Sequence, residues 1–552
     1  KIFNDDGTDG DANVAIIIEL RKNNALSGKG SVRHSYPHSW RSKAPVIFRN
    51  TPQWFISMET NDLRKKALEA IEKVNWYPSQ GKNRILSMIE NRPDWVVSRQ
   101  RAWGVPLSIF YNKATGQPLV DSKLNERIVK MYEENGCDIW FEKSIEELLG
   151  NEYNADDYEK VDDILDVWFD SGCTHAFVLD GKEDQIWPAS IYLEGTDQHR
   201  GWFHSSLLES CGTRGVAPYE SVLTHGFVLH EDGNKMSKSS SNIVPPAEIV
   251  EKSGADILRL WVASSDYSED LKIGPEIIKS NVDSYRRLRN TLRFILGNLN
   301  DFSEDEKVKF LDLPELDQYI LHKLAHLEDE VLKSYQSFEY QRVFSAIFNF
   351  CTNELSSFYF DVRKDSLYCD HRNSLARKAT RTVLDILFNH LLKLLAPILC
   401  FTTEEAWQSR LGTNSSIHNQ DFPSSNQSWI NKDLSSKWDY LKSIRKNVNG
   451  AIEIERKNKL IGSSLEADVE INLVNTDEML KIDVRGLEDI CIVSKLKVVH
   501  SKNLDNCFES SDLKGIGVKI SKVAGSKCNR CWKYFEVLND EGICQRCTEA
   551  IK

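Results

Sequence analysis

The chain has 552 residues and a formal net charge of −12 at pH 7. That length is too great for one hydrophobic core and, at about 150 residues per domain, predicts three or four domains. The apolar and charged fractions are typical of a globular protein. No uncharged apolar run of about 18 residues occurs, which excludes a transmembrane helix. The acidic charge argues against indiscriminate coating of nucleic acid but leaves room for a local basic face.

Residues 34–279 mix short apolar runs with helical segments. Strand-like stretches such as SIYLEG and SVLTHGFVL alternate with helical ones, and this alternation predicts an α/β sheet domain. The part around 107–162 is more charged and irregular, so we expect an inserted subdomain there. The opening segment, 1–33, carries no cationic-then-apolar leader pattern. We expect the chain to begin within a longer protein.

From residue 280 to 411 the pattern becomes helical. One run of apolar residues recurs at steps of mostly three or four and so predicts one helix face: Tyr285, Leu288, Leu292, Ile295, Leu296 and Leu299. Similar periodicity through the rest of this range predicts a helical bundle. Arginines occupy other positions of the same helix, namely Arg286, Arg287, Arg289 and Arg293. A solvated face and a contact surface for RNA are equally compatible with them.

Residues 412–525 begin with a connection rich in Ser, Asn, Gly and Pro. A smaller mixed α/β region follows, with strand-like ADVEINLV and DICIVSKLKVV. The last stretch, 526–552, stands apart because it holds four of the twelve cysteines.

Those four cysteines form two CxxC pairs, Cys528 with Cys531 and Cys544 with Cys547. Two such pairs can place four thiolates around a tetrahedral Zn²⁺, and four protein ligands indicate a structural role. So small a segment would owe much of its stability to the metal. Two disulfides are the alternative. The other cysteines are scattered singly, which favours a reducing cytosol. Arg530, Lys533 and Arg546 make the segment locally basic, which would suit phosphate contact.

A polar stretch, EDGNKMSKSSSN, contains Lys235 and Lys238. A solvated surface loop is the ordinary interpretation of such a run. Two lysines on a loop can also close over a triphosphate and neutralise charge as pyrophosphate leaves. The stretch follows a predicted strand and precedes a predicted helix, where α/β sheets usually bind nucleotides.

The run KMSKS (235–239) resembles a signature of class I aminoacyl-tRNA synthetases. Nearly the whole chain resembles the bacterial isoleucyl-tRNA synthetase family through further blocks: HSYPHSWRSKAPVIFRNTPQWF (34–55), NRPDWVVSRQRAWGVP (91–106), DVWFDSG (166–172), YLEGTDQHRGWF (192–203), GADILRLWVASSDY (254–267), LSSFYFDVRKDSLY (355–368) and the terminal cysteines. The family's HIGH signature has no counterpart in the chain, and residues 1–33 resemble only the closing part of its editing insertion. The resemblance therefore implies the C-terminal half of a Rossmann-like catalytic domain, a helical anticodon-binding domain, a small mixed α/β region and a zinc knuckle.

The resemblance also implies roles for single residues. Lys238 would contact ATP with the help of Lys235, and Glu194 would hold the aminoacyl-adenylate. Asp197 and Gln198 would orient the amino acid. Trp168 and Trp202 would wall the side-chain pocket, although core packing is the ordinary role of a tryptophan.

The implied reaction is ATP-dependent attachment of L-isoleucine to tRNA(Ile) through isoleucyl-adenylate, with Mg²⁺ accompanying ATP. The helical domain would bind the anticodon stem, and a cytoplasmic monomer is expected by resemblance. We expect this chain by itself not to activate isoleucine. The alternatives are a valyl- or leucyl-type synthetase, which the block EGTDQHRGWF disfavours, and a non-catalytic tRNA-binding protein.

Overall fold

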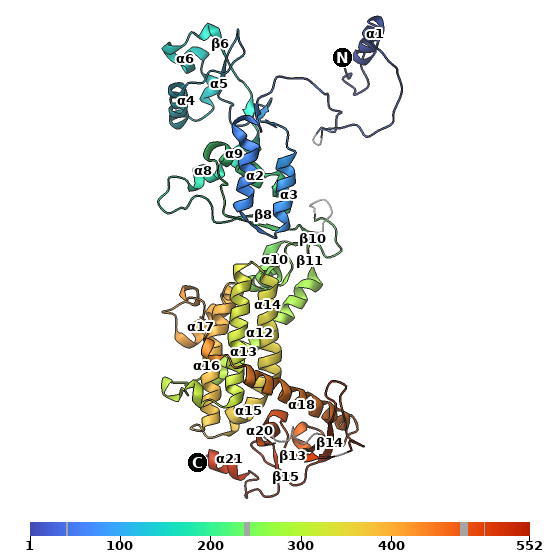
Figure 1. Cartoon of the computed structure of the whole chain (residues 1–552), viewed down its shortest axis with the longest axis vertical. Coiled ribbons are helices and arrows are strands. Elements are labelled where there is room, and N and C mark those ends of the chain that lie inside the picture. Colours follow the sequence, from blue (N-terminus) through green and yellow to red (C-terminus); the bar gives the residue numbers. More distant parts are fainter. Residues whose placement is uncertain (40–41, 237–242, 425, 475–483, 502) are drawn as a thin grey trace. The chain divides into compact units, whose positions relative to one another are not determined.

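The computed structural model describes residues 1–39, 42–236, 243–424, 426–474, 484–501 and 503–552. The chain divides into two compact units (Figure 1). Unit 1 consists of Lys1–Asn75, Lys82–Tyr192 and Asp197–Ser221, and unit 2 consists of Trp76–Gly81, Leu193–Thr196 and Val222–Lys552. No helix in the described part of the chain is both long and apolar enough to cross a lipid bilayer.

Unit 1 is organised around helix α9 (Trp202–Arg214), in which every residue from Phe203 to Cys211 is buried. Helices α2 (Leu63–Lys73) and α7 (Val167–Gly172) pack against it. Unit 1 also contains α1 (Ala12–Lys22), most of α3 (Gln80–Glu90) and α8 (Thr174–Leu179). Its three antiparallel strand pairs are β1 (Phe55–Ile56) with β3 (Trp95–Val96), β4 (Ser98–Arg99) with β7 (Ile164–Leu165), and β5 (Phe110–Asn112) with β6 (Tyr158–Lys160). A helix buried on all sides needs cover from more than one element, and α2 and α7 supply part of it.

A separate small core lies within unit 1, between residues 110 and 158. It holds α4 (Ser122–Asn135), α5 (Ile139–Glu142) and α6 (Ile145–Leu149) together through six buried side chains: Phe110, Leu124, Ile128, Trp140, Leu148 and Leu149. A capping box between Ser144 and Glu147 starts α6, which satisfies backbone donors that a short helix would otherwise leave open.

A three-stranded sheet with the order β2-β9-β8 is formed by β2 (Asn75–Tyr77), β9 (Ser221–His225) and β8 (Tyr192–Gly195). Most of its residues belong to unit 2. In unit 2, β10 (Val228–His230) pairs in parallel with β11 (Leu271–Ile273). Parallel pairing requires a crossover, and α10 (Pro246–Ser253) and α11 (Ala255–Ser264) lie in that connection. This is the expected α/β arrangement.

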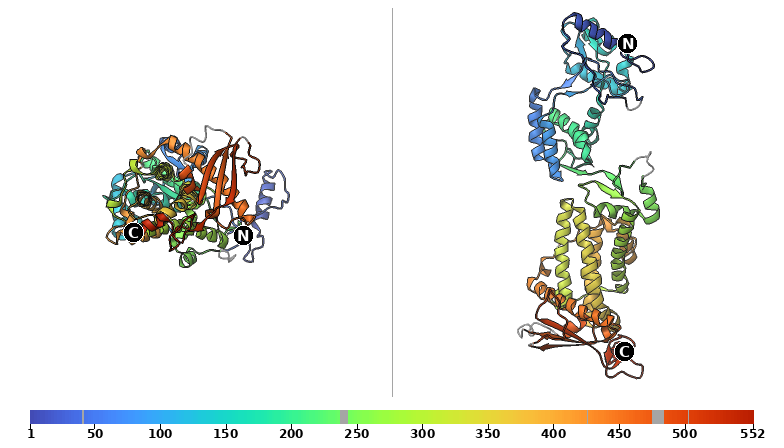
Figure 2. Two further views of the ribbon diagram at one scale, coloured as in Figure 1. Left: turned by 90° about the horizontal axis from the view of Figure 1, so that it is seen from below. Right: turned by 90° about the vertical axis from the view of Figure 1, so that its right-hand side faces the viewer.

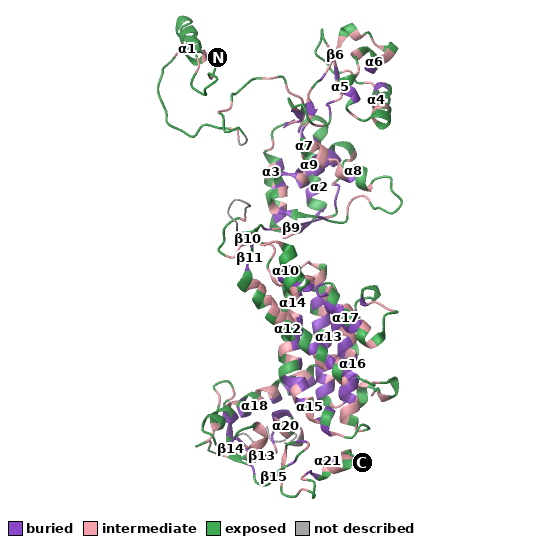
Figure 3. Ribbon diagram, turned by 180° about the vertical axis from the view of Figure 1, so that it is seen from behind, coloured by how far each residue is buried: buried purple, intermediate pink, exposed green. Residues whose placement is uncertain are grey.

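The core of unit 2 is a helical bundle. Figures 1 and 2 show its helices side by side, and Figure 3 shows their buried faces turned toward one another. Its members are α12 (Pro275–Asn298), α13 (Glu315–Gln336), α14 (Tyr340–Asn349), α15 (Phe360–Cys369), α16 (Leu375–Leu395) and α17 (Cys400–Leu411), with a π-helix (Phe350–Tyr359) joining α14 to α15. The predicted apolar face of α12 is confirmed, since Leu288, Leu292 and Ile295 are all buried in the bundle core.

Beyond the bundle, α18 (Lys432–Lys457) packs against a three-stranded sheet and α20 (Val484–Cys491). In that sheet β12 (Ala467–Leu473) lies between parallel β13 (Lys495–His500) and antiparallel β14 (Ile516–Lys522). The strand expected from ADVEINLV is present as β12. Of DICIVSKLKVV only the second half forms a strand, β13, since Asp489–Cys491 belong to α20. The chain closes with the hairpin β15 (Ser526–Lys527) and β16 (Tyr534–Phe535) and the short helix α21 (Gln545–Ala550).

Candidate functional site

Two of the predicted pocket residues meet at the start of α9. Trp168 lies at the start of α7, where the carboxylate of Asp166 accepts a hydrogen bond from its backbone N–H at 3.3 Å. Its ring covers Gly201, because a Cβ atom built there would lie 2.9 Å from Cη2 of Trp168 and 2.5 Å from Oε1 of Gln198. Glycine is thus required for close approach of the ring to the backbone.

Trp202 completes the same cluster. Its backbone N–H donates to Oε1 of Gln198 at 3.0 Å, and its ring nitrogen donates to the carbonyl of Ser171 at 3.1 Å. The ring stacks on Tyr192 with a centroid distance of 3.9 Å. The amide nitrogen of Gln198 donates in turn to Asp197 at 3.1 Å. The structure therefore places Trp168, Trp202, Gln198 and Asp197 around the turn that leads into α9, with the Trp168 ring against Gly201 and the Trp202 ring against Tyr192.

Three other predicted residues lie in unit 2 or outside the described chain. Glu194 is on β8 with an exposed side chain. Lys235 is exposed and forms an isolated β-bridge with Leu229, across a turn closed by a hydrogen bond from the N–H of His230 to the carbonyl of Asn234 at 3.0 Å. Lys238 falls within 237–242, outside the described residues.

A buried carboxyl group that sequence patterns did not single out lies on α9, next to Gly172. Glu209 on α9 is 8% exposed, and its carboxyl group lies beside the thiol of Cys173. Its Oε1 occupies the space of the side chain that Gly172 lacks, 2.2 Å from an ideal Cβ. Burial raises the pKa of Glu209 to about 8, an effect that Asp170 increases and the thiol of Cys173 reduces. A neutral carboxyl group at pH 7 follows. No local sequence pattern marked its burial, since α9 mixes polar and apolar residues throughout.

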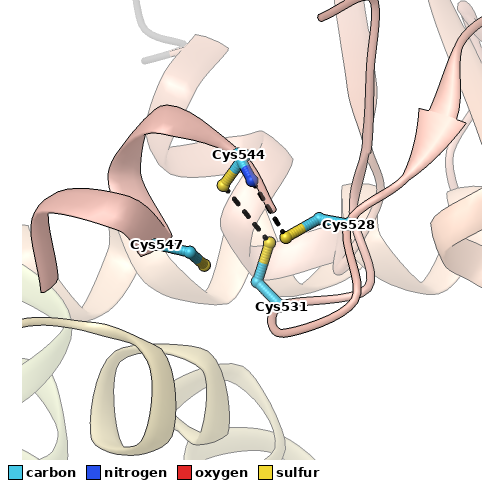
Figure 4. A group of neighbouring side chains, drawn as sticks. All are labelled: Cys528, Cys531, Cys544 and Cys547. Carbon is cyan, nitrogen blue, oxygen red and sulfur yellow. Dashed lines mark hydrogen bonds between the residues drawn. The ribbon is translucent and has the colours of Figure 1, made fainter. Parts of the chain in front are cut away.

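The four C-terminal cysteines converge from two segments. Figure 4 shows the sulfur atoms of Cys528 and Cys531, from the turn after β15, facing those of Cys544 and Cys547 at α21. All four residues are buried, and their sulfurs lie within 4.8 Å of one another. A tetrahedral zinc ion with bonds of about 2.3 Å would separate its sulfur ligands by about 3.8 Å. The sulfurs of Cys531 and Cys544 are 3.8 Å apart, so the cluster fits zinc. All twelve cysteines are free thiols.

The basic residues of this segment bind within the chain. Arg530 and Arg546 each precede the second cysteine of a CxxC pair, and both reach the end of α15. Arg530 donates to the backbone carbonyls of Tyr368 and Cys369. Arg546 donates to both oxygens of Asp365, at 2.5 and 2.8 Å. We call these contacts the arginine clamp.

Lys533 is likewise paired, with Asp489 on α20 at 2.8 Å. Lys533 and Arg546 are therefore ion-paired within the chain, and Arg530 is held by backbone carbonyls. The expectation that these residues contact a phosphate stays a prediction. The sequence signal for the clamp was the repetition of Arg before Cys in CNRC and CQRC. Its acidic partner on α15 could not be identified from that repetition.

Two family models match the chain: "tRNA synthetases class I (I, L, M and V)" over residues 11–274 and "Anticodon-binding domain of tRNA ligase" over residues 317–471. The isoleucine--tRNA ligase of Pelagibacter ubique is 51% identical over 95% of this chain and 57% of its own length. That of Mesorhizobium japonicum is 48% identical over 97% of this chain and 54% of its own length. The chain thus spans somewhat more than half the length of these relatives.

Among solved structures, a methionyl-tRNA synthetase of Mycobacterium tuberculosis in complex with methionyl-adenylate aligns with a TM-score of 0.48 and 17% identity, over 67% of this chain and 65% of that one. That likeness is too low to carry an inference. The sequence relatives and the two family models carry the assignment: over the length that it spans, the chain belongs to the class I tRNA synthetases, with isoleucine--tRNA ligases as its homologues.

Proposed function

We propose that the protein represented by this chain attaches L-isoleucine to tRNA(Ile) at the expense of ATP. The observation that carries the proposal is the cluster of Trp168, Trp202 and Gln198. Two indole rings beside an amide suit an apolar, branched side chain next to polar groups that orient an amino acid. The identity to isoleucine--tRNA ligases over nearly the whole chain supports isoleucine as that amino acid.

The remaining roles follow the family resemblance. Gln198 and Asp197 orient the ammonium group of the amino acid, and Glu194 accepts hydrogen bonds from the adenylate. Lys235 and Lys238 neutralise the phosphates of ATP, which arrives with Mg²⁺. The bundle of unit 2 receives the anticodon stem of the tRNA. A cytoplasmic, monomeric protein fits this role.

The reaction has two steps. An oxygen of the isoleucine carboxylate attacks the α-phosphorus of ATP, and the bond from that phosphorus to the bridging oxygen breaks, releasing pyrophosphate. A ribose hydroxyl of the terminal adenosine of the tRNA then attacks the acyl carbon, and AMP leaves. Positioning and charge neutralisation dominate the first step, as in other transfers at phosphorus.

We also propose that Cys528, Cys531, Cys544 and Cys547 hold one structural Zn²⁺. Four thiolate ligands leave no open coordination position, so the ion would stabilise the terminal segment rather than take part in the reaction.

The proposed function is tested by isoleucine-dependent exchange of pyrophosphate into ATP. The assay is run on this chain and on a version extended upstream along its reading frame. In whichever form exchanges, Trp202→Ala should raise the KM for isoleucine about 30-fold, the loss expected for an indole contact worth about 2 kcal/mol. Trp103→Ala is the matched control, because Trp103 is 93% exposed. Exchange driven by valine or leucine better than by isoleucine would contradict the proposal, and so would tRNA binding with no exchange in either form.

A further inference from the structure

A small cavity of about 260 Å³ opens beside α7 within unit 1. Trp168 lines it, but most of its lining lies outside the tryptophan cluster. The charged side chains and polar groups that line it are Arg92, Asp94, Arg99, Asp166, Arg200, His204 and Ser205. Three guanidinium groups thus face two carboxylates.

Both carboxylates are already engaged. Asp166 pairs with Arg99 at 2.8 Å, accepts a hydrogen bond from Trp95 at 3.3 Å and caps α7. Asp94 accepts the backbone N–H of Met58 at 2.8 Å and is exposed to water. Neither Arg92 nor Arg200 has an ion-pair partner among the residues that the structure describes. The cavity therefore carries uncompensated positive charge.

Two buried nitrogens in the cavity wall lack acceptors. Nε of Arg92 and Nε2 of His204 have no hydrogen-bond partner within the described chain, and His204 is only 4% exposed. The guanidinium of Arg92 lies over the ring of Trp95, 5.6 Å from its centroid. This contact orients the guanidinium but provides no hydrogen-bond acceptor for its Nε. An unmade hydrogen bond of a buried polar group costs about 1–3 kcal/mol, so such groups usually have a partner that arrives from elsewhere.

The pKa shifts of Arg92 and His204 are those expected of groups in a positively charged cavity that could bind an anion. Burial lowers the pKa of Arg92; Asp166 opposes the shift and Arg200 adds to it. Burial also lowers the pKa of His204 to about 3, with the charges of Arg92 and Arg200 contributing. His204 is therefore a neutral imidazole at pH 7, which can donate one hydrogen bond. A bound anion would relieve the repulsion that both shifts report.

We propose that this cavity binds a phosphate-type anion, held by the charges of Arg92 and Arg200 and by hydrogen bonds from Arg92 and His204. Guanidinium groups match the oxygens of phosphate with two parallel hydrogen bonds, and a phosphate offers enough acceptors for all the open donors. The anion could be a backbone phosphodiester of RNA or free pyrophosphate.

The position favours RNA. Trp168 belongs both to this cavity and to the cluster that we assign to the amino acid, and Arg200 lies two residues after Gln198. A phosphodiester near the acceptor end of a tRNA would have to come close to that cluster during acyl transfer. This choice of source depends on the proposed function, whereas anion binding does not.

The test uses Arg200→Gln, because Arg200 is exposed and its loss should leave the fold intact. The matched control is Arg101→Gln, an exposed arginine that does not line the cavity. Binding of an unmodified tRNA(Ile) transcript to the chain is measured by fluorescence anisotropy between 50 and 200 mM salt, conditions chosen because phosphate contacts are salt-dependent. We expect Arg200→Gln to weaken binding about tenfold and to reduce the salt slope by about one, as for one lost phosphate contact. Arg101→Gln should change affinity less than twofold.

Calorimetry with inorganic pyrophosphate forms the second arm. Pyrophosphate binding that Arg200→Gln abolishes, with unchanged RNA affinity, would support the anion site and identify the free anion as its ligand. Equal losses of RNA affinity in both variants, without pyrophosphate binding, would overturn the proposal, and so would no effect on either ligand. Neither arm depends on pyrophosphate exchange into ATP, so the outcome is separate from that of the proposed function.

Discussion

The arginine clamp makes a quantitative prediction for the pair Arg546–Asp365. Two charge-assisted hydrogen bonds join them, and the side chains are 39% and 30% exposed. Burial alone would raise the pKa of Asp365, but hydrogen bonds and the charge of Arg546 lower it. Opposite charges about 4 Å apart attract by about 4 kcal/mol at an effective dielectric constant of 20. Since water screens a third of each side chain, we expect a coupling of about 2 kcal/mol, or roughly 30-fold in the opening equilibrium of the terminal segment.

A double-mutant cycle measures this coupling. Arg546→Met, Asp365→Asn and the double variant are compared by native-state hydrogen exchange of residues 526–552, which reports local opening rather than global unfolding. The control cycle uses Arg456 and Glu453, an exposed pair one turn apart on α18, for which less than about 0.5 kcal/mol is expected. If the effects of Arg546→Met and Asp365→Asn simply add, the clamp does not hold the segment to α15 and the reasoning is refuted.

Three further predictions concern the metal, the buried carboxyl and the bundle. Cys528→Ser, or chelation of zinc, should abolish exchange protection in residues 526–552 while the bundle keeps its cooperative unfolding; loss of both together would contradict a separate metal-stabilised segment. The folded-state pKa of Glu209, about 8, lies above its ordinary value, so its folded state holds a proton that the unfolded state releases. The free energy of unfolding should therefore fall as pH rises from about 4.5 to about 8, by at most about 5 kcal/mol. Glu209→Gln should remove that fall, as measured by urea unfolding at pH 5.5 and 8.5. If the variant loses as much stability between these pH values as the unmodified chain, Glu209 is not its cause. Asp317 is fully buried, pairs with Arg363 and accepts a hydrogen bond from Tyr359 at 2.5 Å. Asp317→Asn should cost about 3–5 kcal/mol in thermal unfolding, and a cost below about 1 kcal/mol would show that the pair is not needed.

Local sequence patterns were sufficient to predict the bundle and, in the C-terminal sheet, β12 and part of β13, whereas β14 was not predicted. The spacing of Leu288, Leu292 and Ile295 defines a face that can only be buried against other helices, and each is buried. The cluster of four cysteine sulfurs could also be predicted. Each CxxC pair is local in the sequence, and two such pairs are the usual ligand set of a structural zinc site. The roles of Lys235 and Glu194 stay predictions.

The long-range contacts could not be predicted. Whether Arg546 meets a phosphate or a carboxylate depends on Asp365, which precedes it by 181 residues, and no local pattern encodes that pairing. Glu209 has the same difficulty: its burial depends on Gly172 and on the cover that α7 gives α9. The 26-residue helix α18 was also not predicted, since the stretch before it has the composition of a loop and the stretch after it is strand-like.

The arginine clamp also has a consequence for the order in which the protein is made. The ribosome adds roughly 5–20 residues each second, so Arg546 emerges about 10–40 s after Asp365. During that interval the end of α15 carries an acidic side chain whose partner does not yet exist, while the helices on either side can already pack. Docking of the cysteine segment onto α15 therefore cannot precede the synthesis of residues 526–552, by which time the bundle helices are already available to pack. If the four cysteines hold zinc as we propose, the supply of zinc at that moment would set how soon residues 526–552 of a newly made chain fold and dock.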